Sequence, residues 1–420
     1  MSENTVGLAL IVRDAASTLD MCLKSVEGLF DQIVVVDKGS TDNTAEIAYK
    51  FGAEVYSMAW ADDFSLARNA SFDRLKTKWA FWLDSDDILV GREHFDEMLS
   101  KCIENGLDGV VLEYIYSLDQ EGKNILESIE PDIINRTISA ESVYRQLKPR
   151  CDTTQFRERL VLRDPAWRWL YPVHEALPVA GKRLGRFDKI KLVHRRHKTG
   201  RPAKNRRNLD ILEKVPEHKR DERIYFYLGL EHAAHHEADK SIEFFKKYLP
   251  LSSVQDEKYL AYHYLADLHR HKGDHDTAIE FDLKAIAMRP TWRDGYAGVL
   301  SSMVVKGDWQ QALYYGAKAK TAEIPDTPFA YNPVHQEIGW VPNYINSLLA
   351  LNMHNEALQE CNEARRKMPE NQDFARIADD LSVMINDESG ATSISETVEY
   401  LLRTDNAEVA AILISRLPKL

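Results

Sequence analysis

Residues 32–56 read QIVVVDKGSTDNTAEIAYKFGAEVY, and this stretch decides the fold of the N-terminal half. An apolar run ending at Asp37 is typical of a buried strand, and the polar segment GSTDNT suits a turn that starts a helix. A helical pattern follows from Thr44, and a second apolar run begins near Glu54. The order is β-α-β. Val/Ile-rich runs without polar alternation indicate strands buried on both faces, as in a parallel sheet covered by helices.

The flanking segments extend this pattern in both directions. GLALIV at 7–12 and WAFWLDSDD at 79–87 are predicted strands, and LDMCLKSVEGL at 19–29 is a predicted helix. We therefore expect an α/β domain with a Rossmann-like, mostly parallel sheet. Ligands of such sheets bind beyond the carboxyl ends of the strands, so Asp37 and the Asp84/Asp86 pair should meet at one crevice. The strand order between 106 and 198 is not predicted.

Composition indicates a folded protein with more than one core. The chain has 420 residues, 44% of them hydrophobic and 29% charged, which favours two domains of ordinary size. Four well-separated cysteines form no CxxC pair, which argues against a zinc site or a disulfide framework and favours a reducing compartment. No segment approaches the ~20 apolar residues of a membrane span. We expect a cytoplasmic protein without a membrane span.

The charge is unevenly distributed along the chain. Net charge is −12, yet residues 182–207 hold twelve Lys/Arg against the single Asp188, a local +11 that leaves −23 elsewhere. The acidic remainder disfavours broad nucleic-acid binding. The basic segment suits neutralisation of a diphosphate or of an anionic acceptor, and the alternative is a solvated basic loop.

From about Asp221 the pattern changes to helical pairs with a repeat of thirty-four residues, the tetratricopeptide period. Small residues, needed where two helices cross closely, recur at this offset, as do Gly-Asp pairs. The positions, with the prolines that end the second helix of a pair, are Gly229, Ser241, Gly273, Asp274, Ala278, Ala285, Pro290, Gly307, Asp308, Ala312, Ala319, Ala357, Ala364 and Pro369. The last unit is displaced by an insertion near 325–336. Four units are predicted, and the alternative is an irregular helical bundle with chance spacing.

These patterns divide the chain into four segments. We expect an α/β domain over 1–200, a basic and polar linker over 201–220, an all-α domain of tetratricopeptide-type repeats over 221–385, and capping helices over 386–420.

The segments VVVDKGSTDNTAEIAYKFGAEVY and WADDFSLARNASFDRLKTKWAFWLDSDD resemble the inverting family-two glycosyltransferases of the GT-A fold. The resemblance spans roughly Gly7 to Leu89, with weaker similarity at PVHEAL and KIKLVHRRH up to about residue 200. Some members of this group carry a tetratricopeptide tail. The resemblance implies transfer of a hexose from a nucleotide sugar, such as UDP-glucose or a UDP-N-acetylhexosamine, with Mn²⁺ or Mg²⁺ as cofactor.

The resemblance implies a nucleotide site at the first strands. Asp37 would accept a hydrogen bond from the uracil imide, as a carboxylate can, and Val12 and Arg13 would contact the donor beside it. The alternative role for Asp37 is to hold the turn over GSTDNT. Many relatives carry Asn-Glu where this chain has Asp14-Ala15, which changes the contacts expected from the first strand.

Asp84-Ser85-Asp86 resembles the DxD motif, which implies that Asp84 and Ser85 contact the donor and that Asp86 ligates the metal. Hard oxygen ligands suit Mg²⁺ or Mn²⁺. His194 resembles the histidine that completes the metal shell or touches the diphosphate in many relatives, and His197 is a competing choice. A purely structural histidine is the alternative.

Asp63 and Arg68 in DDFSLARN resemble a donor-contacting pair, with Asn69 orienting the arginine. The alternative is a helix N-cap at Asp62 or Asp63 followed by a surface arginine. Glu175 in PVHEAL is the candidate general base, and a salt-bridged pair of loop residues is its alternative. Two roles are open for the aromatic residues Trp167, Trp169 and Tyr171: a platform on which a sugar stacks, or positions in the core.

Three functions compete on these residues. The first is an active transferase that acts on a macromolecular acceptor such as a protein, a glycan or modified nucleic acid, with the repeats binding the acceptor, a partner or a second copy. The second is a catalytically weak scaffold. The third, a nucleotidyltransferase, is disfavoured because LALIVRDAAS lacks a glycine- and arginine-rich phosphate loop.

Overall fold

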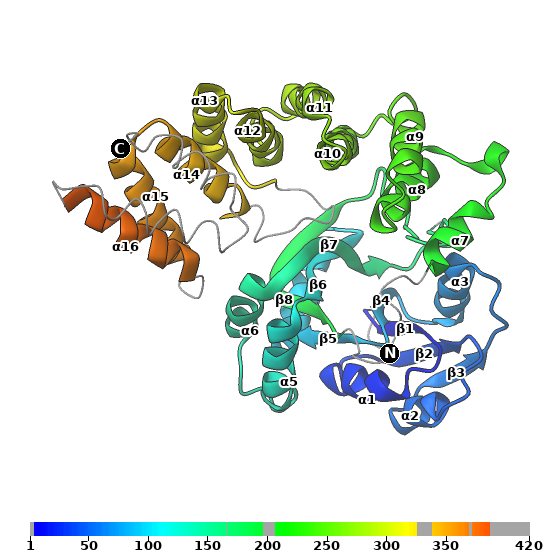
Figure 1. Ribbon diagram of the computed structural model, residues 1–420. Helices are drawn as coiled ribbons and strands as arrows, with labels where there is room; N and C mark the ends of the chain where they lie inside the picture. Colours follow the sequence, from blue (N-terminus) through cyan, green and yellow to red (C-terminus); the bar gives the residue numbers. More distant parts are fainter. Residues whose placement is uncertain (1–3, 166, 196–205, 326–337, 369–371, 387–420) are drawn as a thin grey trace. The chain divides into compact units, whose positions relative to one another are not determined.

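The computed structural model describes residues 4–165, 167–195, 206–325, 338–368 and 372–386 (Figure 1). The chain divides into two compact units, one running to Leu251 and the other starting at Ser252. The first unit therefore includes helices beyond the sheet. The domain bounds expected from the sequence, at 200 and 221, stay a prediction.

The first unit is built on an eight-stranded sheet with the order β3-β2-β1-β4-β7-β6-β8-β5. The first four strands along the chain are mutually parallel, β7 is antiparallel to both β4 and β6, β8 is parallel to β6, and β5 is antiparallel to β8. The strands are β1 (Val6–Val12), β2 (Gln32–Asp37), β3 (Glu54–Ser57), β4 (Trp79–Asp84), β5 (Asp87–Val90), β6 (Gly109–Leu118), β7 (Cys151–Leu162) and β8 (Leu184–His194). The predicted α/β domain with a mostly parallel sheet is confirmed.

Strand β1 is buried on both faces, as its apolar run predicts. Leu8 and Leu10 belong to the core cluster that includes residues of α1 (Ala16–Ser25) and α2 (Thr44–Lys50), whereas Ala9 and Ile11 join clusters that include residues of α3 (Phe64–Arg74). Alternate side chains point to opposite faces of a strand. Helices therefore cover both sides of the sheet here, and polar groups become accessible only where the strands end.

The carboxyl ends of the parallel strands lie in register. Val12 pairs with Asp37, and Ile11 pairs with Asp84. The two aspartates therefore flank the end of β1 on one edge of the sheet, as the sequence predicts.

A helical insertion between β6 and β7 is the main element that the sequence analysis does not predict. It consists of α5 (Gln120–Asn135) and α6 (Ala140–Leu147), which pack a separate core cluster against β5, β6 and β8. Helix α4 (Phe95–Glu104) and the 3-10 turns η1 (Arg92–His94) and η2 (Lys148–Arg150) complete this part of the unit.

Helices alone form the rest of the described chain, and they pack in consecutive pairs (Figure 1). In the first unit these are α7 (Arg207–Glu213), the turn η3 (Glu217–Lys219), α8 (Glu222–Ala234) and α9 (Ala238–Tyr248). In the second unit they are α10 (Gln255–His271), α11 (His275–Met288), α12 (Arg293–Lys306), α13 (Trp309–Thr321), α14 (Val341–Ala350), α15 (His354–Lys367) and α16 (Gln372–Asn386).

The repeat pattern is confirmed by burial. The alanines at the predicted crossing positions, from Ala278 to Ala364, are at most 3% exposed. The predicted insertion near 325–336 and the predicted capping helices over 386–420 lie, apart from their first residues, outside the described residues.

No helix within the described ranges is long and apolar enough to cross a membrane. The four cysteines are all free and buried, in agreement with the absence of a disulfide framework.

The close crossing of α13 and α14 generates a stability prediction. A Cβ atom at Gly316 would lie 2.1 Å from Cδ2 of Tyr344. Gly316→Ala should therefore lower the free energy of unfolding by about 1–3 kcal/mol, although alanine is the better helix former. Thermal unfolding of the full chain measures this. Val305→Ala, at an exposed helical position, is the control and should change stability by less than about 0.5 kcal/mol. A more stable Gly316→Ala variant would contradict the packing described.

Candidate functional site

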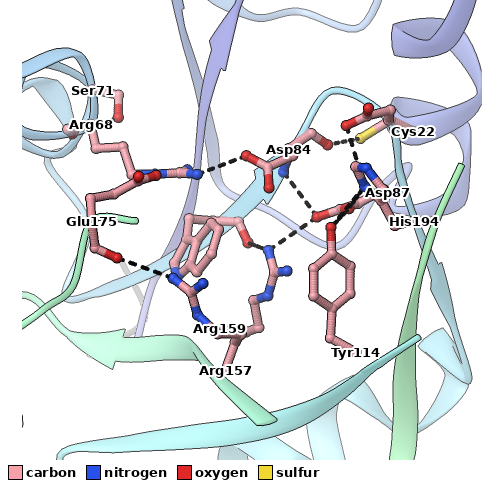
Figure 2. A network of polar contacts seen from close by, with 12 residues as sticks. Cys22, Arg68, Ser71, Asp84, Asp87, Tyr114, Arg157, Arg159, Glu175 and His194 are labelled. Atoms are coloured by element: carbon pink, nitrogen blue, oxygen red, sulfur yellow. Dashed lines mark hydrogen bonds and ion pairs between the residues drawn. The ribbon is translucent and has the colours of Figure 1, made fainter. Parts of the chain in front are cut away.

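The site is built around the turn Asp84-Ser85-Asp86-Asp87, which joins β4 to β5 at the carboxyl edge of the sheet. Asp84 Oδ1 accepts a hydrogen bond from Arg68 Nη2 at 2.7 Å, and its backbone N–H donates to Asp87 Oδ2 at 3.0 Å. Figure 2 shows Asp84 between an Arg68–Glu175 pair on one side and an Asp87–His194 group on the other. The acidic turn therefore connects two distinct polar groups.

Asp86, Asp87 and His194 form a cluster suited to a metal ion, with one ligand atom from each residue lying within 4.8 Å of the others. His194 Nδ1 is 3.6 Å from Asp86 Oδ1 and 3.2 Å from Asp87 Oδ1. The β5–β8 register pairs Asp87 with His194, which brings together residues that are distant in sequence. Carboxylate oxygens with an imidazole suit Mn²⁺ or Mg²⁺.

Asp87 is a site residue that the sequence analysis missed. It is fully buried, and Arg159 Nη1 and Tyr114 Oη contact its carboxylate at 3.1 and 2.5 Å. Tyr114 Oη also lies 2.8 Å from His194 Nδ1. These partners fix both Asp87 and the imidazole, an arrangement typical of groups that orient metal ligands. The only sequence signal for Asp87 is its place as the third acidic residue of LDSDD.

The charges of the acidic turn fit the binding of a cation. Burial, together with the charges of Asp87 and Asp84, raises the pKa of Asp86 to about 6, although His194 opposes the shift. Burial also acts on Asp84, but the Arg68 and Arg159 guanidinium groups outweigh it and hold the pKa of this carboxyl well below its usual range. Asp86 thus carries the excess negative charge that a divalent ion would neutralise.

Arg68 is buried, 6% exposed, which shows that a surface position is wrong for this residue. Its Nε donates to Glu175 Oε1 at 2.5 Å, and its guanidinium carbon lies 4.3 Å from the ring centroid of Trp82 and 5.1 Å from that of Trp169. Two carboxylates and two indole rings therefore surround one cation. A buried arginine with this set of partners is held in a single orientation.

Glu175 joins the site from the loop 170–176, as the predicted base would have to. It is 8% exposed, and its carboxylate is paired with Arg68. Burial alone would raise the pKa of Glu175, but the charge of Arg68 and its hydrogen bond lower it below the ordinary value. Glu175 is therefore ionised at neutral pH. Its catalytic role stays a prediction.

The remaining predicted donor contacts have local partners. Asp37 Oδ1 accepts from the N–H groups of Gly39 and Ser40 and from the Ser40 hydroxyl, which is the turn-holding role given as its alternative. Asp63 caps helix α3 by accepting from Leu66 N at 3.1 Å, again its alternative role. These bonds leave a second carboxylate oxygen on each residue.

The first strand end and the acidic turn contribute three further predicted residues. Val12 is buried, and its carbonyl accepts a hydrogen bond from Lys38 N. Arg13 is exposed and lies 3.7 Å from the Asp14 carboxylate. Ser85 is half-buried in the turn between the two polar groups. His197 lies outside the described residues.

The structure decides between the two roles left open for the tryptophans. Trp167 and Trp169 are 4% and 2% exposed and belong to the core, so they form no sugar platform. Tyr171 donates to Asp221 Oδ2 at 2.8 Å, away from the acidic turn. Asn69 does not orient Arg68, because its amide is hydrogen-bonded to both backbone groups of Trp169.

Lys38 is a second site residue that the sequence analysis missed. Its Nζ lies 4.9 Å from the Trp60 ring centroid and 4.6 Å from that of Phe64, and within the described ranges it has no hydrogen-bond or ion-pair partner. Burial and the positive charges of Arg68 and Arg207 lower the pKa of Lys38 to about 8. A half-buried lysine thus follows directly after the end of β2.

The described ends of the basic segment are folded and paired, which argues against a wholly solvated loop. Arg195 N donates to Asp86 O at 2.6 Å, and its guanidinium pairs with Glu130. Arg206 pairs with Glu237, and Arg207 lies 4.9 Å from the Phe64 ring centroid. Residues 196–205 lie outside the described part.

Comparison with known proteins agrees with this site. A mostly parallel sheet with an acidic turn at its carboxyl edge is typical of GT-A domains, and residues 9–167 match the family model for glycosyl transferase family 2. The N-terminal part of the chain is thus a family-two glycosyltransferase domain, followed by tetratricopeptide-type repeats as predicted.

Relatives among curated proteins match short stretches only. Over 85 residues the chain is 44% identical to a TPR repeat-containing protein of Synechococcus elongatus, covering 20% of this chain and 21% of that protein. Over 86 residues it is 33% identical to the SPbeta prophage-derived glycosyltransferase SunS of Bacillus subtilis, covering 20% of each. The chain thus spans about a fifth of the length of these relatives.

Solved structures share a low overall similarity with the chain. Glucosyl-3-phosphoglycerate synthase from Mycobacterium tuberculosis, in complex with Mn²⁺, uridine diphosphate and glucosyl-3-phosphoglycerate, is 16% identical with a TM-score of 0.31, over 46% of this chain and 73% of that one. The TPR protein YrrB is 16% identical with a TM-score of 0.35, over 50% and 97%.

The raised pKa of Asp86 generates a pH prediction for metal binding. Because a carboxylate must lose its proton to ligate a metal, Mn²⁺ affinity should rise with pH through about 6 and should be roughly tenfold weaker at pH 5 than at pH 7. Protonation of His194 acts in the same direction. Calorimetric titration of the metal-free protein with Mn²⁺ at pH 5, 6 and 7 measures this. Equal affinities at all three values would place the metal elsewhere.

Proposed function

We propose that this protein transfers a hexose from a uridine-diphosphate sugar to a macromolecular acceptor, with inversion at the anomeric carbon and with Mn²⁺ or Mg²⁺ as cofactor. One observation carries the proposal. The metal-type cluster Asp86/Asp87/His194 and the buried Arg68–Glu175 pair meet at Asp84, on the edge of the sheet where ligands bind.

Asp86, Asp87 and His194 would hold the cation, which when bound neutralises the charge that develops on the departing diphosphate. Asp87 is held by Arg159 and Tyr114, so the ligands need little rearrangement when the metal binds. Asp84 would orient the donor from the other end of the same turn.

Glu175 would act as the general base. In the transfer step the acceptor oxygen forms a bond to the anomeric carbon, the bond from that carbon to the diphosphate oxygen breaks, and the acceptor proton passes to the Glu175 carboxylate. Arg68 keeps Glu175 ionised and ready to receive the proton. The same arginine holds Asp84, so the positions of base and donor are linked.

The preference for uracil over other nucleobases would come from Asp37. Within the described residues only Oδ1 of its carboxylate is engaged, by the turn, which leaves Oδ2 for the uracil imide. The half-buried cation of Lys38 beside it suits an anionic nucleotide.

The acceptor class follows from the repeats, whose stacked helices commonly bind proteins in other repeat families. We place the reaction in a reducing, cytoplasmic compartment, which the four free cysteines support. We assign to the helical repeats the binding of the acceptor, of a protein partner or of a second copy of the chain. A pure scaffold is not favoured, because the acidic and basic site residues are retained and connected.

The decisive experiment measures hydrolysis of a panel of nucleotide sugars in Mn²⁺. Turnover should be highest for a UDP-hexose, and Asp86→Asn should abolish it without lowering the melting temperature, because the cation loses a ligand. Asp96→Asn, on the exposed surface of α4, is the matched control and should keep wild-type turnover. Full turnover by Asp86→Asn, with EDTA still inhibitory, would remove Asp86 from the metal shell.

A second experiment tests the base. Glu175→Gln retains an oxygen that can accept from Arg68 but removes the basic group, so transfer and hydrolysis should slow by roughly 10²–10⁴-fold. Calorimetric affinity for uridine diphosphate should change by less than about threefold, because the nucleotide does not contact this residue in the proposed geometry. Wild-type rates would rule out Glu175 as the base.

A further inference from the structure

The loop 170–176 that carries Glu175 has an unusual backbone. Leu170 and Ala176 exchange two backbone hydrogen bonds, of 2.9 and 3.1 Å, which close the loop at its base. Between them Tyr171 has φ of 74° and His174 has φ of 53°, left-handed values that non-glycine residues rarely adopt. Such residues are strained and persist only where the surroundings hold them.

The inner side of the loop is attached to helix α3. Phe64 N donates to Pro172 O at 2.8 Å, and the Arg68 side chain holds the Glu175 carboxylate. Asn69 fixes the backbone of Trp169, just before the loop. None of these contacts involves the side chains of the two left-handed residues.

The outer side of the loop is held by helix α8, and it is held at the two left-handed residues. Tyr171 Oη donates to Asp221, the N-cap of α8, at 2.8 Å. His174 Nε2 lies 2.7 Å from Glu231 Oε1, and its ring stacks on Tyr227 with centroids 4.1 Å apart and planes 10° apart.

Two further contacts complete this attachment of α8 to the loop. Arg223 Nη2 donates to His174 O at 2.9 Å, so both the backbone and the side chain of His174 are bound. Asn208, from α7, donates to Glu231 Oε1 at 3.3 Å and so fixes the glutamate that holds the histidine. All these residues lie in the first compact unit.

We propose that α8 is a positioning element of the glycosyltransferase site, in which Glu231, acting through His174, sets the position of the Glu175 carboxylate. His174 and Glu175 are adjacent and point to opposite sides of the loop, one to α8 and one to Arg68. Fixing the first therefore fixes the second. The inference rests on the proposed function, because it assigns the base to Glu175.

This role differs from packing support in what it changes. A displaced base slows the chemical step and leaves donor binding intact, since misplacement by about 1 Å costs on the order of 10²-fold in rate. Loss of packing would instead lower stability and donor affinity together. The rate effect should also disappear when Glu175 is no longer basic, because Glu231 acts only through it.

The test uses the full chain and hydrolysis of the UDP-hexose that the panel selects. Glu231→Ala should lower kcat at least tenfold, with KM for the donor and calorimetric affinity for uridine diphosphate within threefold of wild type. Glu231→Gln keeps an oxygen that accepts from His174 and should recover most of kcat. Glu243→Ala, which removes only a surface ion pair of α9, is the matched control and should be unchanged.

Each variant is repeated in the Glu175→Gln background, where Glu231→Ala should lower kcat by less than twofold further. Tyr171→Phe removes only the hydroxyl that donates to Asp221, and so it loosens the loop by a smaller change. This variant tests the inference even if Glu231→Ala does not fold. It should lower kcat severalfold in the wild-type background alone.

Two results would overturn the inference: equal losses in both backgrounds, or a fall in donor affinity that matches the fall in kcat. A wild-type kcat for Glu175→Gln alone would refute the base assignment in the proposed function, and with it any positioning through that residue. Loss of kcat for Glu175→Gln together with wild-type kcat for Glu231→Ala and Tyr171→Phe would refute the positioning role alone.

Discussion

The ion pair of Arg68 with Asp84 and Glu175 is the interaction on which the site depends. The three residues come from α3, from the end of β4 and from the loop 170–176, so one buried guanidinium connects three parts of the fold. Removing it would leave two carboxylates without their shared cation, and one of them, Glu175, is buried, where an unpaired charge is costly. The indole rings of Trp82 and Trp169 lie against the same guanidinium.

A second arginine, Arg159, forms an ion pair with Asp87 at the other end of the acidic turn. Arg159 and Asp87 are both fully buried, and the Arg159 guanidinium carbon lies 3.8 Å from the Trp82 ring centroid. Trp82 therefore contacts both arginines, Arg68 and Arg159. Two buried cations hold the carboxylates of the turn on either side, while Asp86 remains the acid without an arginine partner among the described residues. Burial therefore raises the pKa of Asp86 above the ordinary carboxyl value.

The sequence was sufficient for those features that depend on local pattern. The apolar runs ending in Asp37 and Asp84 predicted the parallel strands and their common edge, and the alanine spacing predicted the paired helices. Features that depend on distant partners were not predictable. Asp87 becomes a site residue only through the register that sets it against His194, and the burial of Arg68 requires Glu175, 107 residues further along. The contact between the strained loop and α8 has no sequence signature, since positive φ at Tyr171 and His174 is visible only in three dimensions.

The strand pairing at the edge of the sheet also bears on how the chain matures. Strand β5 lies at the outer edge and pairs with β8, which begins almost a hundred residues later, so Asp86 and Asp87 leave the ribosome long before His194. Contacts of such wide separation form late, because the intervening chain must be ordered first. The three-residue cluster is therefore complete only once the last strand has been added. A cation bound there would favour the finished sheet over partly folded forms.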